Sequence, residues 1–392
     1  MKITSIKLRD FRNYPALELT PHPGINLLFG QNGSGKTNLL EAIHYCALGR
    51  SHRTGQDREV VRRGAEMGAA GVTVEKLNGR HEVAVRLVPN GQRRKLAFVD
   101  RKKAARLSEM MGVVQCVIFS PEDLMLVKET PAVRRRFTDM TASQLSPGYF
   151  VALQKYQKAL EQRNAVLHDA KYNRVPADPV LLDAFEQTMA ECSGLLIRSR
   201  RELLGRMNEL AAVRYRDISG RDAETFTMTY ADCLNGDTGD EEQRCLDRWR
   251  MLRQEDIRRG TTTFGVHRED IGLYLTGREM KQFASQGQVR TAALAMKLAE
   301  LDLMREKAGE DPILLLDDVM SELDMNRRTR LLRSLGSVQT FVTCTDESDL
   351  DGCGDKRTYH VAMSAEGNGG VRETAEGERV DAPPEDEEPD FS

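Results

Sequence analysis

The 392-residue sequence has no long apolar run and no cysteine pattern typical of a metal site or a disulfide framework. No stretch approaches the roughly 20 consecutive apolar residues that a membrane helix needs, and no signal peptide precedes the first predicted strand. The seven cysteines are scattered without a C-x-x-C pair, which argues against bound zinc and against paired disulfides. These absences favour a reducing compartment, and we expect a cytoplasmic protein.

The net charge of −3 conceals an uneven distribution along the chain. Residues 376–392 hold eight acidic residues and one arginine, a net charge of −7, so the remaining chain carries +4. The body of the protein can therefore be basic where a nucleic acid would touch it. Because the terminal segment has three prolines and no apolar period, we predict a disordered acidic tail at residues 371–392.

Residues 30–37 carry the strongest chemical signal. They fit the phosphate-binding pattern G-x-x-x-x-G-K-S/T in the order Gly30, Gln31, Asn32, Gly33, Ser34, Gly35, Lys36 and Thr37. An apolar strand precedes this loop, and a helix follows it, so backbone N–H groups and the helix dipole converge on one point. The pattern predicts a bound nucleoside triphosphate, with Lys36 on the β- and γ-phosphates and the Thr37 hydroxyl on Mg²⁺.

Segments with strand character lie at both ends of the chain, and helical segments lie between them. The predicted strands are at residues 2–8, 14–20, 70–76, 81–88, 94–99, 113–119, 226–230, 270–275, 313–316, 339–344 and 357–363. Two helices near residues 153–167 and 182–196 suit a short antiparallel pair. We therefore predict an α/β head whose halves, residues 1–120 and 261–370, flank a helical lobe at residues 121–260.

The strand at residues 313–316 ends in two carboxylates, Asp317 and Asp318. Asp317 is placed to hold Mg²⁺ opposite Thr37, and Asp318 to act as general base toward the attacking water. A buried strand that ends in a polar pair is common at any sheet edge. Beside a phosphate loop, however, a catalytic site is the favoured interpretation.

A second phosphate-facing helix N-terminus is predicted further along the chain. It consists of Ser285, Gln286, Gly287 and Gln288, which supply a hydroxyl, a glycine and exposed N–H groups ahead of a predicted helix. In isolation these four residues are a weak indication, because such turns are common. Their position 32 residues before Asp317 gives them weight.

This order of motifs resembles the ATP-binding-cassette head of the SMC-like DNA-repair ATPases. A further match follows the two carboxylates, with Ser321 and Asp324 in the position of the cassette D-loop. The resemblance implies that two heads pair head-to-tail, with each ATP between one phosphate loop and the signature of the other head. Ser285 and Gly287 would then contact the γ-phosphate in trans, and Asp324 would bridge the interface.

Shorter segments narrow the resemblance to the bacterial RecF family. The matching segments are residues 11–14, 49–54, 119–124, 134–137 and 316–324, within an agreement that covers roughly residues 1–363. The resemblance implies that Arg12 lies beside the nucleotide and that Thr345 occupies the switch position of the cassette. Asp318 stands where cassettes usually have glutamate, and this shorter base predicts slow hydrolysis. Gln115 is a candidate for the Mg²⁺-sensing glutamine, or is simply a strand residue.

The same resemblance implies DNA as a partner. We expect an ATP-dependent homodimer on single- and double-stranded DNA at gaps and junctions, with weak DNA-stimulated ATPase activity, RecR and RecO as partners, and RecA loading as the outcome. Candidate contacts to DNA phosphates are Arg134, Arg135, Arg136, Lys155 and Lys158. No base-reading motif accompanies them, so binding would be sequence-independent and salt-sensitive. A solvated basic face is the alternative for each cluster.

Three other functions stay open at this point. An SMC-like structural clamp would need longer arms, and a transporter cassette would need membrane partners. A small-molecule P-loop kinase would have no use for residues 285–288 or 321–324.

Overall fold

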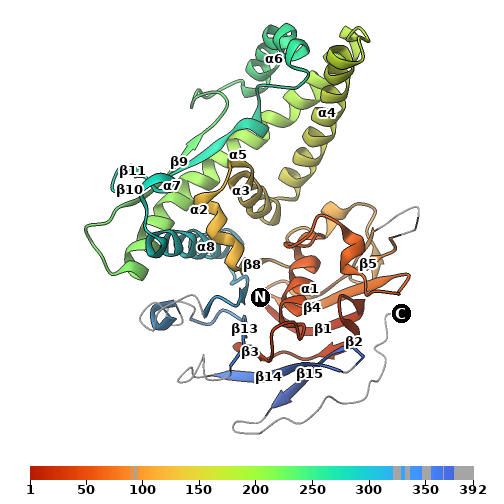
Figure 1. Cartoon of the computed structure of the whole chain (residues 1–392), viewed down its shortest axis with the longest axis vertical. Coiled ribbons are helices and arrows are strands. Elements are labelled where there is room, and N and C mark those ends of the chain that lie inside the picture. The colour runs from red at the N-terminus through yellow and green to blue at the C-terminus, as the bar shows by residue number, and fades with distance from the viewer. Residues whose placement is uncertain are drawn as a thin grey trace. The chain divides into compact units, whose positions relative to one another are not determined.

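The chain folds into two compact units (Figure 1). The computed structural model describes residues 1–89, 91, 95–320, 328–331, 336–346, 355–364 and 366–374. The unit called the head unit here comprises Met1–Asp123, Asp217–Ser219 and Lys297–Ser392. The other, called the helical unit, comprises Leu124–Arg216 and Gly220–Met296.

One sheet of the head unit is antiparallel, with the strand order β2-β1-β4-β5-β6-β7. Its strands are β1 (Lys2–Phe11), β2 (Tyr14–Leu19), β4 (Gly68–Lys76), β5 (Gly79–Leu87), β6 (Lys95–Val99) and β7 (Lys102–Lys103). Val83, Val85 and Leu87 alternate with more exposed residues along β5, as expected for a sheet with one face in the core. The tight turn between β1 and β2 holds Arg12 at a positive φ of 55°.

The second sheet of the head unit has the order β15-β14-β3-β13-β12-β8. Its strands are β3 (Ile25–Phe29), β8 (Cys116–Phe119), β12 (Ile313–Asp317), β13 (Thr340–Cys344), β14 (Lys356–Met363) and β15 (Gly369–Thr374). All its pairings are parallel except that of β15 with β14. Strands β8, β12 and β13 are buried along their whole length, which explains their continuous apolar runs.

Helix α1 (Lys36–Leu48) packs against strands of both sheets in the head unit. Leu39 to Leu48 are buried without a break, so this helix lies in the core of the unit rather than on its surface. Three short 3₁₀ turns complete the description of this part of the chain, η1 (Asp57–Val60), η2 (Leu107–Glu109) and η3 (Pro121–Leu124).

The helical unit is built from helices around a small antiparallel sheet of order β11-β10-β9. Its elements are α2 (Met125–Lys128), α3 (Pro131–Leu145), α4 (Pro147–Tyr172), α5 (Pro179–Ser219), β9 (Phe226–Ala231), α6 (Glu241–Arg259), η4 (Val266–Arg268), β10 (Asp270–Leu275), β11 (Arg278–Glu279) and α7 (Met280–Phe283). Helix α8 (Gln286–Ala308) begins in this unit, and its residues from Lys297 onward belong to the head unit. Within the described ranges, no helix is both long and apolar enough to span a bilayer.

The structure differs from the sequence prediction in helix α5 and in the C-terminal segment. Helix α5 runs for 41 residues, longer than the short pair suggested, because buried positions continue through Met207, Ala211 and Tyr215. Residues 371–374, predicted to belong to the disordered tail, pair with β14 as part of β15, and residues 375–392 lie outside the described residues.

Residues 261–296, which the sequence assigned to the C-terminal half of the head, fall within the helical unit. The reason is strand pairing, since β10 pairs with β9 in one sheet. The division into two head halves and a lobe with boundaries at 120 and 260 stays a proposal.

Buried ion pairs hold the helical unit together. Arg163, the residue that interrupts the apolar period of α4, donates to Glu186 Oε1 at 2.9 Å and to Asp256 Oδ2 at 2.8 Å. All three side chains are fully buried. The pairing joins α4, α5 and α6, and each charge has its partner inside the unit, which is the condition under which buried charges are tolerated.

We expect Arg163→Ala to lower the free energy of unfolding by about 3–5 kcal/mol, because Asp256 would stay buried without its counter-ion and Glu186 would keep only Arg253. Chemical denaturation of the purified protein measures this change. Arg258→Ala is the matched control, because Arg258 pairs with Glu255 at the surface, and its loss should cost at most about 1 kcal/mol. Equal effects of the two variants would contradict the assignment of Arg163 to the core.

Candidate nucleotide-binding site

The phosphate loop joins β3 to α1 through glycines in conformations that other residues rarely adopt. Gly30, Gly33 and Gly35 have φ values of 148°, 85° and 116°. A Cβ on Gly30 would lie 2.2 Å from the Val361 carbonyl oxygen, so a larger residue cannot fit there. Lys36 Nζ donates to the carbonyl oxygens of Gly30 and Gln31 at 2.5 and 2.9 Å, which closes the loop around the ammonium group.

The turn between β1 and β2 supports this loop from outside. Asn13 Nδ2 donates to the Ser34 carbonyl oxygen at 3.0 Å, and the Tyr14 hydroxyl donates to the Gly35 carbonyl oxygen at 3.1 Å. A Cβ on Gly35 would lie 2.5 Å from Asn13 Nδ2. The sequence contained these residues in a recognisable segment but no signal for their support of the loop, which depends on tertiary contact.

Thr37 and Asp317 lie together at the carboxyl ends of the parallel strands. Thr37 Oγ1 donates to Asp317 Oδ1 at 2.8 Å. Asp317 ends the buried strand β12 and is only 7% exposed. Burial raises the pKa of Asp317, and the hydrogen bonds from Thr343 and Thr37 lower it by less, so the net shift is upward. A hydroxyl and a carboxylate oxygen at this spacing are the ligand types that Mg²⁺ prefers beside a nucleotide phosphate.

No cluster of three or more histidine, cysteine or acidic side chains that could bind a metal occurs in the described part of the chain. The pair of Thr37 and Asp317 fits a metal ion that also takes oxygen ligands from the nucleotide and from water, as Mg²⁺ does.

Thr343, near the end of β13, links the carboxylate of Asp317 to the backbone of Asp318, and the sequence prediction missed it. Its hydroxyl donates to Asp317 Oδ1 at 2.8 Å and accepts the backbone N–H of Asp318 at 2.9 Å. Asp318 is exposed, with a positive φ of 52°. The register of β12 and β13 pairs Asp317 with Thr343, and this register is not readable from one sequence.

Arg12 is held by a partner within the head unit. Its Nε and Nη2 donate to the two carboxylate oxygens of Glu41 at 2.8 and 2.6 Å, and its Nη1 donates to the Glu59 carbonyl oxygen at 2.7 Å. Glu41 is a fully buried residue of α1. The position of Arg12 beside the nucleotide stays a prediction.

The predicted signature lies at the start of α8, in the helical unit. Ser285 Oγ accepts the backbone N–H of Gln288 at 3.3 Å, and Gln288 Oε1 accepts that of Ser285 at 2.9 Å. This reciprocal pair is a capping box, with Ser285 directly before the first residue of the helix, Gln286. Ser285 and Gln286 are exposed, and Gly287 is half-buried.

Of the other predicted site residues, some lie within the described ranges and others do not. Thr345 is exposed just after β13, and Gln115 is buried just before β8. Ser321 and Asp324 lie outside the described residues, so the D-loop assignment stays a prediction.

The basic residues proposed for DNA divide into buried and exposed ones. Arg134 is buried and forms a two-bond ion pair with Asp270, at 2.8 and 2.9 Å, so its charge is used inside the helical unit, which speaks against a DNA contact. Arg135 is half-buried and donates to the Glu269 carbonyl oxygen. Arg136, Lys155 and Lys158 are exposed.

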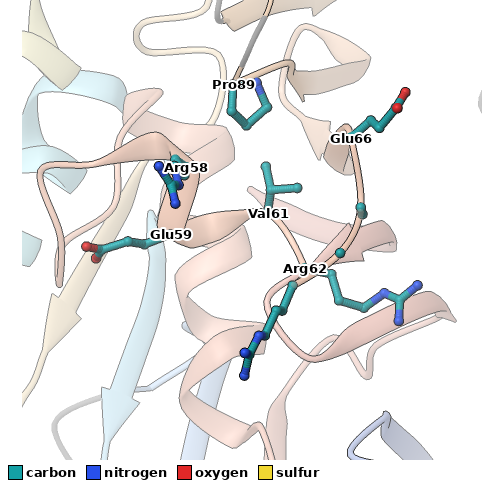
Figure 2. Close-up of a pocket in the computed structure, with 9 residues that line it drawn as sticks. Arg58, Glu59, Val61, Arg62, Glu66 and Pro89 are labelled. Atoms are coloured by element: carbon teal, nitrogen blue, oxygen red, sulfur yellow. The ribbon is translucent and has the colours of Figure 1, made fainter.

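The head unit also has a pocket with arginines that the sequence analysis did not single out. Figure 2 shows this pocket, with a volume of about 590 Å³, beside η1 and the segment that leads to β4. It is lined by Arg58, Glu59, Val61, Arg62, Arg63, Gly64, Ala65, Glu66 and Pro89. Arg62 is held by Asp10 at 2.6 Å, whereas Arg58 and Arg63 are exposed.

Comparison with known proteins identifies the family. The family model described as the RecF/RecN/SMC N terminal domain matches residues 2–368. The DNA replication and repair protein RecF of Lacticaseibacillus casei is 41% identical over 349 residues, which is 88% of this chain and 93% of the relative. The chain belongs to the RecF family. The RecF protein of Listeria welshimeri is also 41% identical, over 90% of this chain and 95% of its own.

Solved structures of RecF agree with this membership. The recombination mediator protein RecF described as RecF-ATP is 32% identical, with a TM-score of 0.85, over 95% of this chain and 98% of that one. The Smc head domain of Pyrococcus furiosus, 15% identical with a TM-score of 0.56, shares the fold alone. The predicted fold class, an ABC-type ATPase head with an inserted helical lobe, is confirmed, and the comparisons place the chain among DNA replication and repair proteins.

We expect Thr343→Val to reduce kcat for ATP hydrolysis about tenfold or more, with a smaller change in ATP affinity. Without the hydroxyl, Asp317 loses one donor and the N–H of Asp318 loses its acceptor, so the carboxylate of Asp318, the predicted general base, would shift relative to the attacking water. Steady-state ATPase kinetics measure this effect. Thr343→Ser keeps the hydroxyl and should retain most of the activity. If valine and serine variants had equal rates, the role assigned to this hydroxyl would be wrong.

Proposed function

We propose that this member of the RecF family is an ATP-dependent DNA-binding protein of recombinational repair, in which ATP acts as a switch for assembly. The observation that carries this proposal is the hydrogen bond of 2.8 Å between Thr37 and Asp317 at the mouth of the phosphate loop. The RecF relatives with ATP support the same ligand here.

Four residues of the head unit bind ATP and promote its hydrolysis in this proposal. Lys36, whose ammonium group already lies inside the loop, binds the β- and γ-phosphates. Thr37 and Asp317 hold Mg²⁺, which neutralises charge on the phosphates when it is bound. Asp318 orients the attacking water, and its short side chain makes hydrolysis slow. We also propose that the ATPase activity is weak and that DNA stimulates it.

The signature supplies the second half of the site from a second copy of the protein. Ser285 and Gly287 lie at the N-terminus of a 23-residue helix, where unpaired N–H groups and the helix dipole favour an anion. The exposure of Ser285 leaves it accessible to a partner copy. Asp324 and Ser321 are proposed to complete the interface, and ATP then links two heads head-to-tail.

The closed dimer is proposed to hold single- and double-stranded DNA through its phosphates, at gaps and junctions where RecA must be loaded. The exposed residues Lys155, Lys158 and Arg136 are the contacts we favour in the helical unit, and Arg58 and Arg63 add exposed charge in the head unit. The RecFOR pathway, in which the RecF relatives act, supports RecR and RecO as partners, and we propose the cytoplasm as the location.

We expect Ser285→Arg to abolish ATP-dependent dimerisation while the monomer still binds ATP, because a long cation would fill the space that the partner's nucleotide needs. Analytical ultracentrifugation with and without ATP measures the dimer, and titration with a fluorescent ATP analogue measures binding. Ser285→Ala controls for loss of the helix cap, about 1 kcal/mol, and should fold with the same stability as the arginine variant. Normal dimerisation of Ser285→Arg would contradict the trans site.

We expect the double variant Lys155→Gln/Lys158→Gln to weaken DNA binding at all sequences and to reduce the slope of log affinity against log salt by about 1–2. Fluorescence anisotropy on gapped DNA at several salt concentrations measures the slope. Lys102→Gln/Lys103→Gln makes the same change of charge on the exposed strand β7. If both double variants lowered the slope equally, the effect would reflect overall charge and not a DNA contact by Lys155 and Lys158.

A further inference from the structure

A fully buried carboxylate lies in α1 just beyond the phosphate loop. Glu41 accepts two hydrogen bonds from the guanidinium of Arg12, at 2.8 and 2.6 Å, and a third from the Ser51 hydroxyl. Arg53 Nη1 lies 3.6 Å from Glu41 Oε2. One buried anion therefore contacts the turn after β1, the segment after α1 and the helix that carries Lys36.

We propose that Glu41 is a positioning residue of the nucleotide site, which orients Arg12 and Arg53 and through them the phosphate loop. This inference rests on the proposed function, because it assumes that residues 30–37 bind ATP. It assigns to Glu41 no contact with the nucleotide itself.

The first path from Glu41 leads to Arg12. This arginine has a positive φ of 55°, a conformation that costs a non-glycine residue free energy. The pair of hydrogen bonds to Glu41 and a third to the Glu59 carbonyl oxygen hold it there. Because a two-bond contact fixes the plane of the guanidinium, the donors of Arg12 that face away from Glu41 keep one direction.

The second path leads to the phosphate loop through a chain of side-chain amides. Arg53 Nη1 donates to Asn38 Oδ1 at 3.0 Å, and Asn38 Nδ2 donates to Asn13 Oδ1 at 2.8 Å. Asn13 Nδ2 then donates to the carbonyl oxygen of Ser34, within the loop, at 3.0 Å. Glu41 thus acts on the loop over four steps, each with a donor and an acceptor in hydrogen-bond geometry or ionic contact.

The charges of this cluster suit a site for a triphosphate. Burial raises the pKa of Glu41, but hydrogen bonds from Arg12 and Ser51 and the charge of Arg12 outweigh it, and the net shift is downward. Glu41 is therefore ionised at neutral pH. Together with Arg12 and Arg53 it makes a cluster of net charge +1.

Burying a glutamate costs free energy of folding that an apolar side chain of similar size would not cost, because the apolar side chain needs no charged partners. What a carboxylate adds is direction, because it fixes the planes and donors of the groups that bind it. The neighbouring positions Leu39, Leu40 and Ile43 in the same helix are apolar and buried, as packing alone would require.

The test is a cycle of variants measured for ATP affinity. Glu41→Gln keeps the shape and removes the charge, and we expect it to raise the Kd for ATP about tenfold, which corresponds to about 1.4 kcal/mol. In the background of Arg12→Ala/Arg53→Ala, the same change should alter the Kd less than about twofold, because the groups through which Glu41 acts are gone. A tenfold effect in both backgrounds would show a merely structural role and overturn the inference.

Two further variants keep the test decisive. Glu18→Gln, which removes a carboxylate paired with Lys7 on the surface of the head unit at 3.0 Å, should leave the Kd for ATP unchanged. If Glu41→Gln does not fold, Ser51→Ala replaces it in the test. This variant removes one hydrogen-bond donor to Glu41, keeps the charges of Glu41, Arg12 and Arg53, and should raise the Kd for ATP about two- to threefold. An unchanged Kd in Ser51→Ala would overturn the inference in that case.

The outcome for the wild type separates this inference from the proposed function. If the wild type fails to bind ATP in the same assay, the proposed function is wrong. If the wild type binds ATP and Glu41→Gln binds it equally well, only the role of Glu41 is wrong.

Discussion

The carboxylate of Asp317 is the group on which the geometry of the nucleotide site depends. It ends a strand that is buried along its whole length, where an unpaired charge would be costly. Two threonine hydroxyls satisfy it, one from the first turn of α1 and one from the end of β13. Thr37, Asp317 and Thr343 belong to three different elements of the head unit. The site therefore exists only when the parallel sheet has formed in its native register.

The same requirement explains the buried charges elsewhere in the molecule. In the head unit, Glu41 is surrounded by donors from two segments that flank α1. In the helical unit, Arg163 joins three helices, and Arg200 contacts Asp139 and Glu269 at 2.7 and 2.5 Å. Charges of this kind are stable only with all partners present. They therefore favour one arrangement of helices over alternatives with equally good apolar packing.

Much of the fold and part of the site could be predicted from the sequence. The strands β3 and β12 and the phosphate loop follow from apolar runs and a spaced motif, whose physical causes are local. The longer α5 and the strand β15 were not predicted. Tertiary contact extended the helix through positions of mixed polarity, and β15 is defined by its pairing with β14. Basic residues were the least predictable group, since Arg134 and Lys155 look alike in sequence while only one of them is buried.

The sequence by itself determined the family, the phosphate loop and the identity of the two carboxylates that follow β12. These depend on residue types at fixed spacing, and local chemistry specifies them. Only the tertiary structure decided that Thr343 links Asp317 to Asp318, that Glu41 holds Arg12, and that Arg134 pairs with Asp270. Each of these contacts joins segments between 25 and 136 residues apart. Strand register and helix packing bring such residues together, and no local pattern in the chain records which charges will be buried.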